Sequence, residues 1–253
     1  MLLFQQPPLT QYDLQFSIAG IPVRVHPLFW LIAILFGSAG GSLLFVPIWV
    51  FVIFISILIH ELGHAFAFRR YGQRSHIVLH MGGGLTIPES VSWGGGWASV
   101  ALSRGQEIFI SLAGPFAGFL FAAIIITSVL LTGGSVATYH LLGFIPLPLV
   151  ALIPYGGALL GTLVQQLLWV NIFWGLINLV PVQPLDGGNV ARNIFLQYDP
   201  WDGVRKALWL SVIAGSLVAL VGLIAFRSLY MALLFGFLAY QSYQSVQGRY
   251  GRF

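Results

Sequence analysis

Long apolar stretches separated by short polar segments form the dominant pattern along this chain. A bilayer core about 30 Å thick needs about 20 helical residues to cross it, and the apolar stretches reach or approach that length. The pattern therefore predicts about six transmembrane helices. Their expected ranges are 27–40, 43–68, 107–131, 163–183, 206–225 and 228–246.

A second pattern, the alternation of apolar and polar residues, appears in two shorter regions. Residues 14–25 alternate on both sides of a turn at Ala19-Gly20-Ile21-Pro22, and residues 75–88 contain a strand pattern interrupted by three glycines. We predict an all-α polytopic membrane protein with a small membrane-associated β-sheet. No internal repeat or linker divides residues 1–253, so we expect a single domain.

Residues 139–162 are apolar but interrupted by prolines and glycines. The distribution of lysine and arginine among the loops decides whether they form a seventh span. With six spans and a cytoplasmic N-terminus, ten of the eleven lysines and arginines lie in the cytoplasm and only Arg227 lies outside. This obeys the positive-inside rule, which a seventh span at 139–162 would break. We therefore predict a re-entrant or interfacial segment there, and both termini in the cytoplasm of a prokaryotic cell.

Composition excludes a water-soluble fold. The chain is 58% hydrophobic and 7% charged, with a mean hydropathy of +0.89, which indicates a multi-pass protein embedded in a lipid bilayer. The isoelectric point near 9.6 does not indicate nucleic acid as a partner, because the basic residues are spaced between apolar segments. The N-terminus lacks the basic region of a cleaved signal peptide. Cysteine is absent, so a metal site must use nitrogen and oxygen ligands.

The apolar stretch that ends at Arg69-Arg70 contains His60-Glu61-Leu62-Gly63-His64. Ionisable residues inside a membrane helix are costly and usually functional. On a helix the two histidines project about 40° apart and Glu61 about 100° from His60, so the three share one face. This is the HExxH arrangement, in which two imidazoles bind Zn²⁺ and the glutamate accepts a proton from water. Structural hydrogen bonding between helices is the simpler alternative.

Catalytic zinc usually has three protein ligands, so a further residue is needed. Asp186 fits best, because it follows the cytoplasmic end of a predicted helix, and Gly187-Gly188 would let the backbone turn and aim the short side chain inward. An exposed carboxylate at a helix end is the alternative. The other candidates on the same side are His26, His76, His80, Glu89, Asp199 and Asp202.

Two motifs together resemble the site-2 protease family of intramembrane zinc metalloproteases. One is HELGH within a membrane helix, and the other is the segment 178–188, Asn-Leu-Val-Pro-Val-Gln-Pro-Leu-Asp-Gly-Gly. Further similarity lies at Gly20-Ile21-Pro22-Val23 before His26-Pro27, at Gly82-Gly83-Gly84, and at Leu112-Ala113-Gly114-Pro115. The chain shows neither the PDZ domain nor the CBS domains that many members carry.

The resemblance implies one Zn²⁺ per chain, bound by His60, His64 and Asp186, with Glu61 as the catalytic acid and base. We expect Asn178, eight residues before Asp186 on the same helix, to stabilise the oxyanion or hold the substrate backbone, or to make an interhelical hydrogen bond. Asn171, one heptad earlier, is expected to be structural. The substrate would be a transmembrane protein cut in or near its membrane segment, which releases a cytoplasmic fragment in regulated intramembrane proteolysis.

Two other functions use the same cluster of histidine and aspartate. A metal-ion transporter could hold an ion at the membrane midplane, but its inverted repeats are not seen and transport does not need Glu61. A non-proteolytic membrane chaperone would not need the full set of catalytic residues. The oligomeric state stays open between a monomer and a homo-oligomer.

Overall fold

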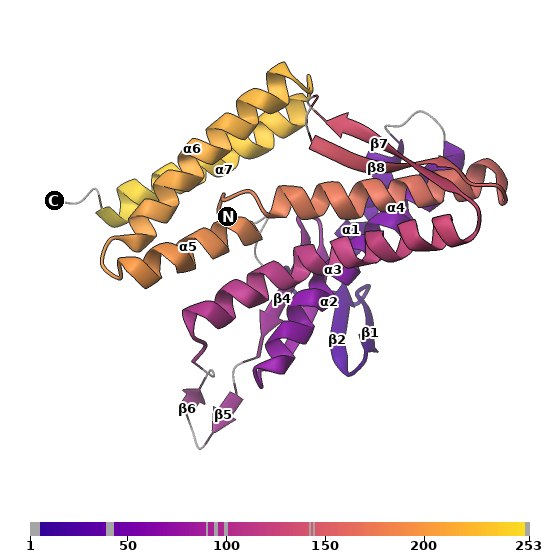
Figure 1. Ribbon diagram of the computed structural model, residues 1–253. Coiled ribbons are helices and arrows are strands. Elements are labelled where there is room, and N and C mark those ends of the chain that lie inside the picture. The colour runs from indigo at the N-terminus through magenta and orange to yellow at the C-terminus, as the bar shows by residue number, and fades with distance from the viewer. Residues whose placement is uncertain are drawn as a thin grey trace. The chain divides into compact units, whose positions relative to one another are not determined.

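The structure is a computed structural model that describes residues 6–38, 43–89, 91–93, 96–98, 101–141, 143 and 145–250. The described chain is mostly helical, with a small sheet and two separate strand pairs (Figure 1). It divides into two compact units, Met1–Ala101 with Ala113–Gly175 and Leu102–Leu112 with Leu176–Phe253. The assignment of residues 1–253 to a single domain stays a prediction.

The first unit contains a four-stranded sheet in the order β1-β2-β3-β4. The strands are β1 (Leu14–Ile18), β2 (Ile21–Val25), β3 (Ser75–His80) and β4 (Gly83–Pro88). Both strand regions predicted from alternation are therefore confirmed. The hairpins β1-β2 and β3-β4 are antiparallel, whereas β2 and β3 pair in parallel, with Val23 opposite Ile77. Among the described strands, β4 is left at one edge of this sheet.

Two helices connect β2 to β3 in the sequence, and they pack against the apolar side chains of these strands. They are α1 (Pro27–Ser38) and α2 (Val46–Arg70), and the 3₁₀ helix η2 (Leu43–Phe45) precedes α2. The core combines strand residues such as Val25 and Ile77 with Phe29 of α1 and Ile57 of α2. Burial of these side chains fixes α2 against the sheet, and the residues of the HELGH motif are placed by it.

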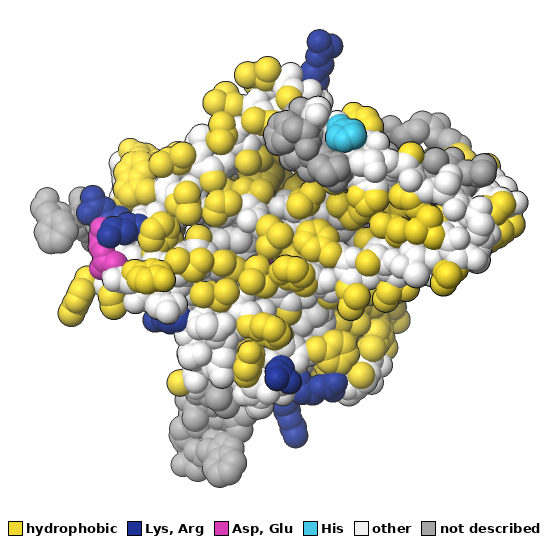
Figure 2. All heavy atoms as spheres, viewed as in Figure 1, with side chains coloured by type: hydrophobic (Ala, Val, Ile, Leu, Met, Phe, Trp, Pro, Cys, Tyr) yellow, Lys and Arg dark blue, Asp and Glu magenta, His cyan; other side chains and the backbone are white. Residues whose placement is uncertain are grey.

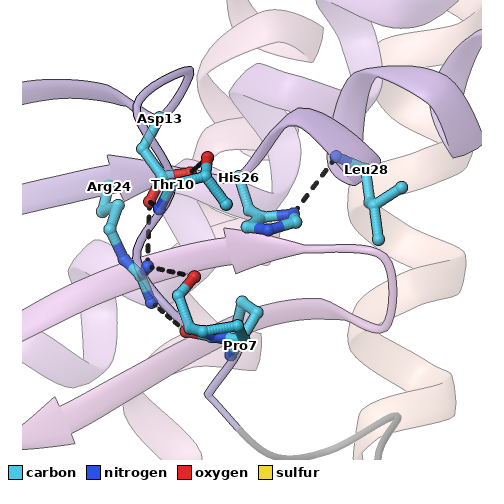
Figure 3. Close-up of polar contacts among 7 residues, drawn as sticks. Pro7, Thr10, Asp13, Arg24, His26 and Leu28 are labelled. Carbon is cyan, nitrogen blue, oxygen red and sulfur yellow. Dashed lines mark hydrogen bonds and ion pairs between the residues drawn. The ribbon is translucent and has the colours of Figure 1, made fainter.

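Arg24 of β2 is buried and binds the segment before β1 (Figure 3). Its guanidinium donates to the Asp13 carboxylate at 2.9 Å and to the carbonyl oxygens of Pro8 at 3.2 Å and Pro7 at 2.9 Å. The hydroxyl of Thr10 also donates to Asp13, at 2.6 Å. Burial raises the pKa of Asp13, but the hydrogen bonds from Thr10 and Arg24 outweigh it and hold the pKa below its ordinary value.

The rest of the first unit consists of longer helices and two strand pairs. These elements are most of α4 (Gly157–Asn178), most of α3 (Arg104–Leu131), the pair β5 (Val91–Trp93) and β6 (Gly96–Ala98), and the pair β7 (Ser135–Leu141) and β8 (Ile145–Leu152). Val52 of α2 packs with Leu167 and Val170 of α4. The segment 139–162 contains the end of β7, its antiparallel partner β8 and the start of α4, and its interfacial or re-entrant placement stays a prediction.

The second unit contains the first turns of α3 with α5 (Asp186–Tyr198), α6 (Gly203–Ile224) and α7 (Leu229–Tyr250). α6 and α7 run side by side (Figure 1). They approach closely at Gly215, where an added methyl group would lie 3.1 Å from the Cβ of Ala239. α3 begins at a capping box, in which Ser103 and Gln106 each accept a hydrogen bond from the other's backbone N–H.

Four helical segments in the described chain are long and apolar enough to cross a membrane. They are Leu43–Arg70, Arg104–Leu131, Gly157–Asn178 and Gly203–Ile224. The prediction of about six spans is therefore not confirmed, because α1 has only 12 residues and the second half of α7 carries several glutamines. Hydrophobic side chains are spread widely over the face in Figure 2, and charged ones are few. These features are those of an integral membrane protein; the orientation of its termini and its prokaryotic origin stay predictions.

Candidate metal centre

The histidines of the HELGH motif lie together on one face of α2, as predicted. His60, Glu61 and His64 are all buried. The Nε2 atoms of the two imidazoles are 3.2 Å apart, and the ring planes meet at 79°. Two nitrogens on one tetrahedral zinc, each about 2.0–2.1 Å from the ion, would lie about 3.3 Å apart. The histidine pair therefore fits a shared zinc ion.

Two glycines allow this arrangement. A methyl group on Gly114 of α3 would overlap the imidazole of His64, so the ring packs directly against the α3 backbone. α2 also approaches α3 closely at Gly63. A methyl group on Gly63 would overlap the backbone of Ala113 and lie 2.8 Å from the Cβ of Ala117. Small residues let membrane helices approach in this way. The sequence motif contains Gly114, but its contact with the histidine could not be read from it.

The Glu61 side chain contacts β4. The hydroxyl of Thr86 lies 2.6 Å from Glu61 Oε2 and 3.0 Å from the Glu61 carbonyl oxygen. A hydrogen bond to an ionised group contributes about 1.5–3 kcal/mol. A methyl group at Gly84 would overlap the Glu61 carboxylate. Neither contact was predicted, since a tertiary hydrogen bond from a strand threonine leaves no periodic signal.

The segment that leads to Asp186 differs from the prediction. α4 ends at Asn178 and α5 begins at Asp186, so the prediction that these two residues share one helix is wrong. Pro181 is the physical reason, because proline lacks the N–H that would continue the helix and clashes with the preceding turn. The backbone instead closes with short-range bonds, from Leu179 N–H to Leu176 and from Val180 N–H to Ile177. α5 lies between two of the predicted helix ranges, 163–183 and 206–225, and was not predicted.

The glycines after Asp186 have a different purpose from the predicted one. Gly187 and Gly188 are the second and third residues of α5 and have no positive φ, so they do not provide a turn. A methyl group on Gly187 would overlap the carbonyl of Leu179, and one on Gly188 would lie 2.6 Å from the backbone of Val182. The glycine pair therefore lets the first turn of α5 pack against the connecting segment, which places Asp186 at the helix start.

Two of the other histidines have structural partners. His26 Nδ1 accepts a hydrogen bond from the Leu28 N–H at 3.2 Å, so His26 caps the start of α1 (Figure 3). His80 Nδ1 accepts from the Gly82 N–H at 3.2 Å. Burial lowers the pKa of His80, and electrostatic interaction with His26 and Arg24 lowers it further. The Nδ1 atom of each of these two rings is therefore occupied by a backbone N–H.

The remaining candidates also have partners of their own. His76 and Glu89 lie 3.8 Å apart at the surface. Asp199 accepts a hydrogen bond from Lys206 at 2.6 Å, and Asp202 lies 3.9 Å from the arginine three residues later. These contacts compete with metal binding by Glu89, Asp199 and Asp202.

Comparison with known proteins agrees with the two motifs. Peptidase family M50 matches residues 48–220, which is more than half of the chain. A zinc metalloprotease of Methanocaldococcus jannaschii is 26% identical over 182 residues, which cover 71% of this chain and 44% of the relative. Rip3 of Mycobacterium tuberculosis is 30% identical over 210 residues, which cover 81% of this chain and 41% of the relative. The chain thus spans less than half the length of these relatives.

A solved structure shows the same fold. The site-2 protease from Methanocaldococcus jannaschii matches with a TM-score of 0.54 and 24% identity, over 93% of this chain and 95% of that protein. The resemblance inferred from the HELGH and Leu-Asp-Gly motifs is therefore confirmed. This chain belongs to Peptidase family M50, the site-2 protease family.

Proposed function

We propose that this protein is an intramembrane zinc metalloprotease. Its substrate would be a membrane protein, cut in or near a transmembrane segment so that a cytoplasmic fragment is released. The observation that carries the proposal is the buried His60–His64 pair, with Nε2 atoms 3.2 Å apart on a helix long enough to span a membrane. A relative that is named as a zinc metalloprotease supports the same chemistry.

The proposed metal site holds one Zn²⁺ per chain, bound by His60, His64 and Asp186. Support for the histidines comes from the distance between their Nε2 atoms, and support for Asp186 comes from its place in the family motif. A set of two imidazoles and one carboxylate is a ligand set of catalytic zinc, which keeps a fourth position for water or substrate.

Glu61 is the proposed general base and acid. Zinc, when bound, supplies Lewis acidity that makes water a nucleophile near neutral pH and polarises the scissile carbonyl. Glu61 follows His60 directly, so its carboxylate can take a proton from the attacking water and return it to the leaving amine. Its burial excludes bulk water from this proton transfer.

Asn178 is the proposed second catalytic residue. It is buried at the C-terminal end of α4, and its amide could donate to the oxyanion or to the substrate backbone. Its place at a helix end, next to the segment that precedes Asp186, supports the assignment. An interhelical hydrogen bond is the competing role.

The substrate is proposed to bind as an extended strand along β4. A peptide bond inside a helix is shielded, so a transmembrane substrate must unwind before it is cut. β4 lies at the edge of the described four-stranded sheet and contacts Glu61 through Thr86. Strand addition at this edge would present the substrate backbone near the proposed base.

The metal-transporter alternative is not favoured, since family membership and the intact HELGH motif both point to peptide hydrolysis. The chaperone alternative would leave zinc binding without a reaction. Both alternatives make the same prediction, which is that the purified, zinc-loaded protein does not cut a substrate.

The test is cleavage of a single-span membrane protein by purified protein in detergent or vesicles. We expect a chelator to abolish cleavage and added zinc to restore it. Glu61→Gln should keep one zinc per chain and lose hydrolysis, because an amide cannot accept the proton. Turnover by zinc-loaded Glu61→Gln would exclude Glu61 as the base, and an inactive zinc-loaded wild type would exclude the protease.

A further inference from the structure

We propose that Thr86 is a positioning residue for Glu61: its hydroxyl holds carboxylate oxygen Oε2 and so fixes the rotation of the carboxylate that takes the proton from water. The proposal rests on the proposed function, since it assigns a partner to the proposed general base. It also assigns a second purpose to β4, the strand on which a substrate is expected to pair.

The geometry of the hydroxyl supports this role. A threonine hydroxyl has one proton, and at 2.6 Å from Glu61 Oε2 and 3.0 Å from the Glu61 carbonyl oxygen it can donate to one of them at a time. The carboxylate oxygen is both nearer and the stronger acceptor when ionised. Because an ionised carboxylate only accepts hydrogen bonds, the donor must be Thr86, which leaves the second oxygen for another donor.

Gly84 completes the contact from the same face of the strand. Residues two apart on a strand point the same way, so the Cα of Gly84 and the side chain of Thr86 both face Glu61. A methyl group at Gly84 would overlap the carboxylate. The strand thus combines an opening that admits the carboxylate with a donor that fixes its rotation.

The rival explanation is that Thr86 only attaches β4 to α2. In that case the bond to the backbone carbonyl of Glu61 would matter, and removal of the hydroxyl would lower stability without a specific effect on turnover. The two roles predict different effects of removing the Glu61 carboxylate on the contribution of Thr86 to stability. A positioning contact must disappear with the carboxylate, whereas a contact with the backbone carbonyl must survive.

The experiment uses the full-length, zinc-loaded protein and four variants. Thr86→Val removes the hydroxyl and keeps the shape, Thr86→Ser keeps the hydroxyl, and Thr86→Ala is a second variant without the hydroxyl in case valine does not fold. Thr127→Val is the matched control, since that hydroxyl donates to the Ala123 carbonyl on an exposed face of α3. Zinc content, kcat and KM are measured for each.

We expect Thr86→Val and Thr86→Ala to lower kcat about 10-fold or more, with KM within about 2-fold and zinc content unchanged. Thr86→Ser should recover most of kcat, and Thr127→Val should match the wild type. Equal losses in Thr86→Ser and Thr86→Val, a loss in KM alone, or an undiminished kcat would each overturn the proposal.

A second readout does not depend on activity. The thermal midpoint should fall on Thr86→Val in the wild type and not in a Glu61→Ala background, because the hydroxyl's partner is then absent. An equal fall in both backgrounds would assign the contact to the backbone carbonyl and overturn the proposal. An inactive zinc-loaded wild type would contradict the proposed function instead, so the two failures are distinct.

Discussion

The side-chain amide of Asn171 donates a hydrogen bond of 2.9 Å to the hydroxyl of Ser56, and this bond joins α4 to α2 one turn before His60. The same amide also donates to the Leu167 carbonyl at 2.8 Å. Asn171 is buried, so the bond is shielded from water. The expectation that Asn171 is structural agrees with these contacts.

We therefore predict energetic coupling between Asn171 and Ser56. In a double-mutant cycle, Asn171→Leu and Ser56→Ala should show a coupling of about 0.6 kcal/mol, the usual size for a hydrogen bond between membrane helices. Unfolding in detergent measures it. Ser128→Ala removes an exposed hydroxyl of α3 and should not couple to Asn171→Leu. Additive effects of Asn171→Leu and Ser56→Ala would show that the bond contributes nothing.

Gly114→Ala should damage the metal centre, because its methyl group would push the His64 ring from its place. Overpacking of this kind costs about 1–3 kcal/mol, so we expect zinc affinity and activity to fall about 10-fold or more. Gly105→Ala, near the start of the same helix, is the control, since its methyl group would meet no atom within 4 Å. Full zinc content in Gly114→Ala would contradict the packing argument.

Asp186→Ala should lose zinc, whereas Asp199→Ala should keep it. Asp186 is the proposed third ligand, whereas Asp199 has an exposed salt bridge to Lys206, and solvent-exposed salt bridges contribute little to stability. Zinc per chain, measured after dialysis against a weak chelator, distinguishes the two. If both variants retained one zinc per chain, a different third ligand would be required.

The contact between Asp13 and Arg24 should make stability depend on acid pH. The folded pKa of Asp13 is lowered, so its ionised form stabilises the fold above the ordinary value of 3.8. That contribution is lost as pH falls through the lower folded pKa. Asp13→Asn should lower the thermal midpoint at pH 6, and the difference from wild type should shrink below about pH 3.8. A constant difference across this range would contradict the assignment.

Local patterns in the sequence predicted the parts of the site that lie on one element. His60, Glu61 and His64 are neighbours on a single helix, so their spacing alone placed them on one face. The contacts of Glu61 with Thr86 and of His64 with Gly114 join residues far apart in sequence. Such contacts depend on how the sheet and helices pack, which no periodicity encodes.

Helix ends were predicted less well than helix positions. The apolar run through residue 183 continues past Pro181, and hydropathy does not detect that the backbone must leave the helix at Asn178. α5 was missed for a related reason. It starts with Asp186-Gly187-Gly188-Asn189, whose helix propensity is poor, and forms because the glycines pack closely against Leu179 and Val182.

The parallel pairing of β2 with β3 has a consequence for the order in which the protein assembles. Val23 pairs with Ile77, 54 residues later, and α1 and α2 lie in the intervening chain. Closure of so long a loop is slow, and β2 cannot pair with β3 until both helices and β3 have been synthesised. β4 is made later still, and the proposed general base therefore gains its threonine partner only after this late closure. We expect nascent chains that end before Pro88 to contain α2 without an ordered Glu61.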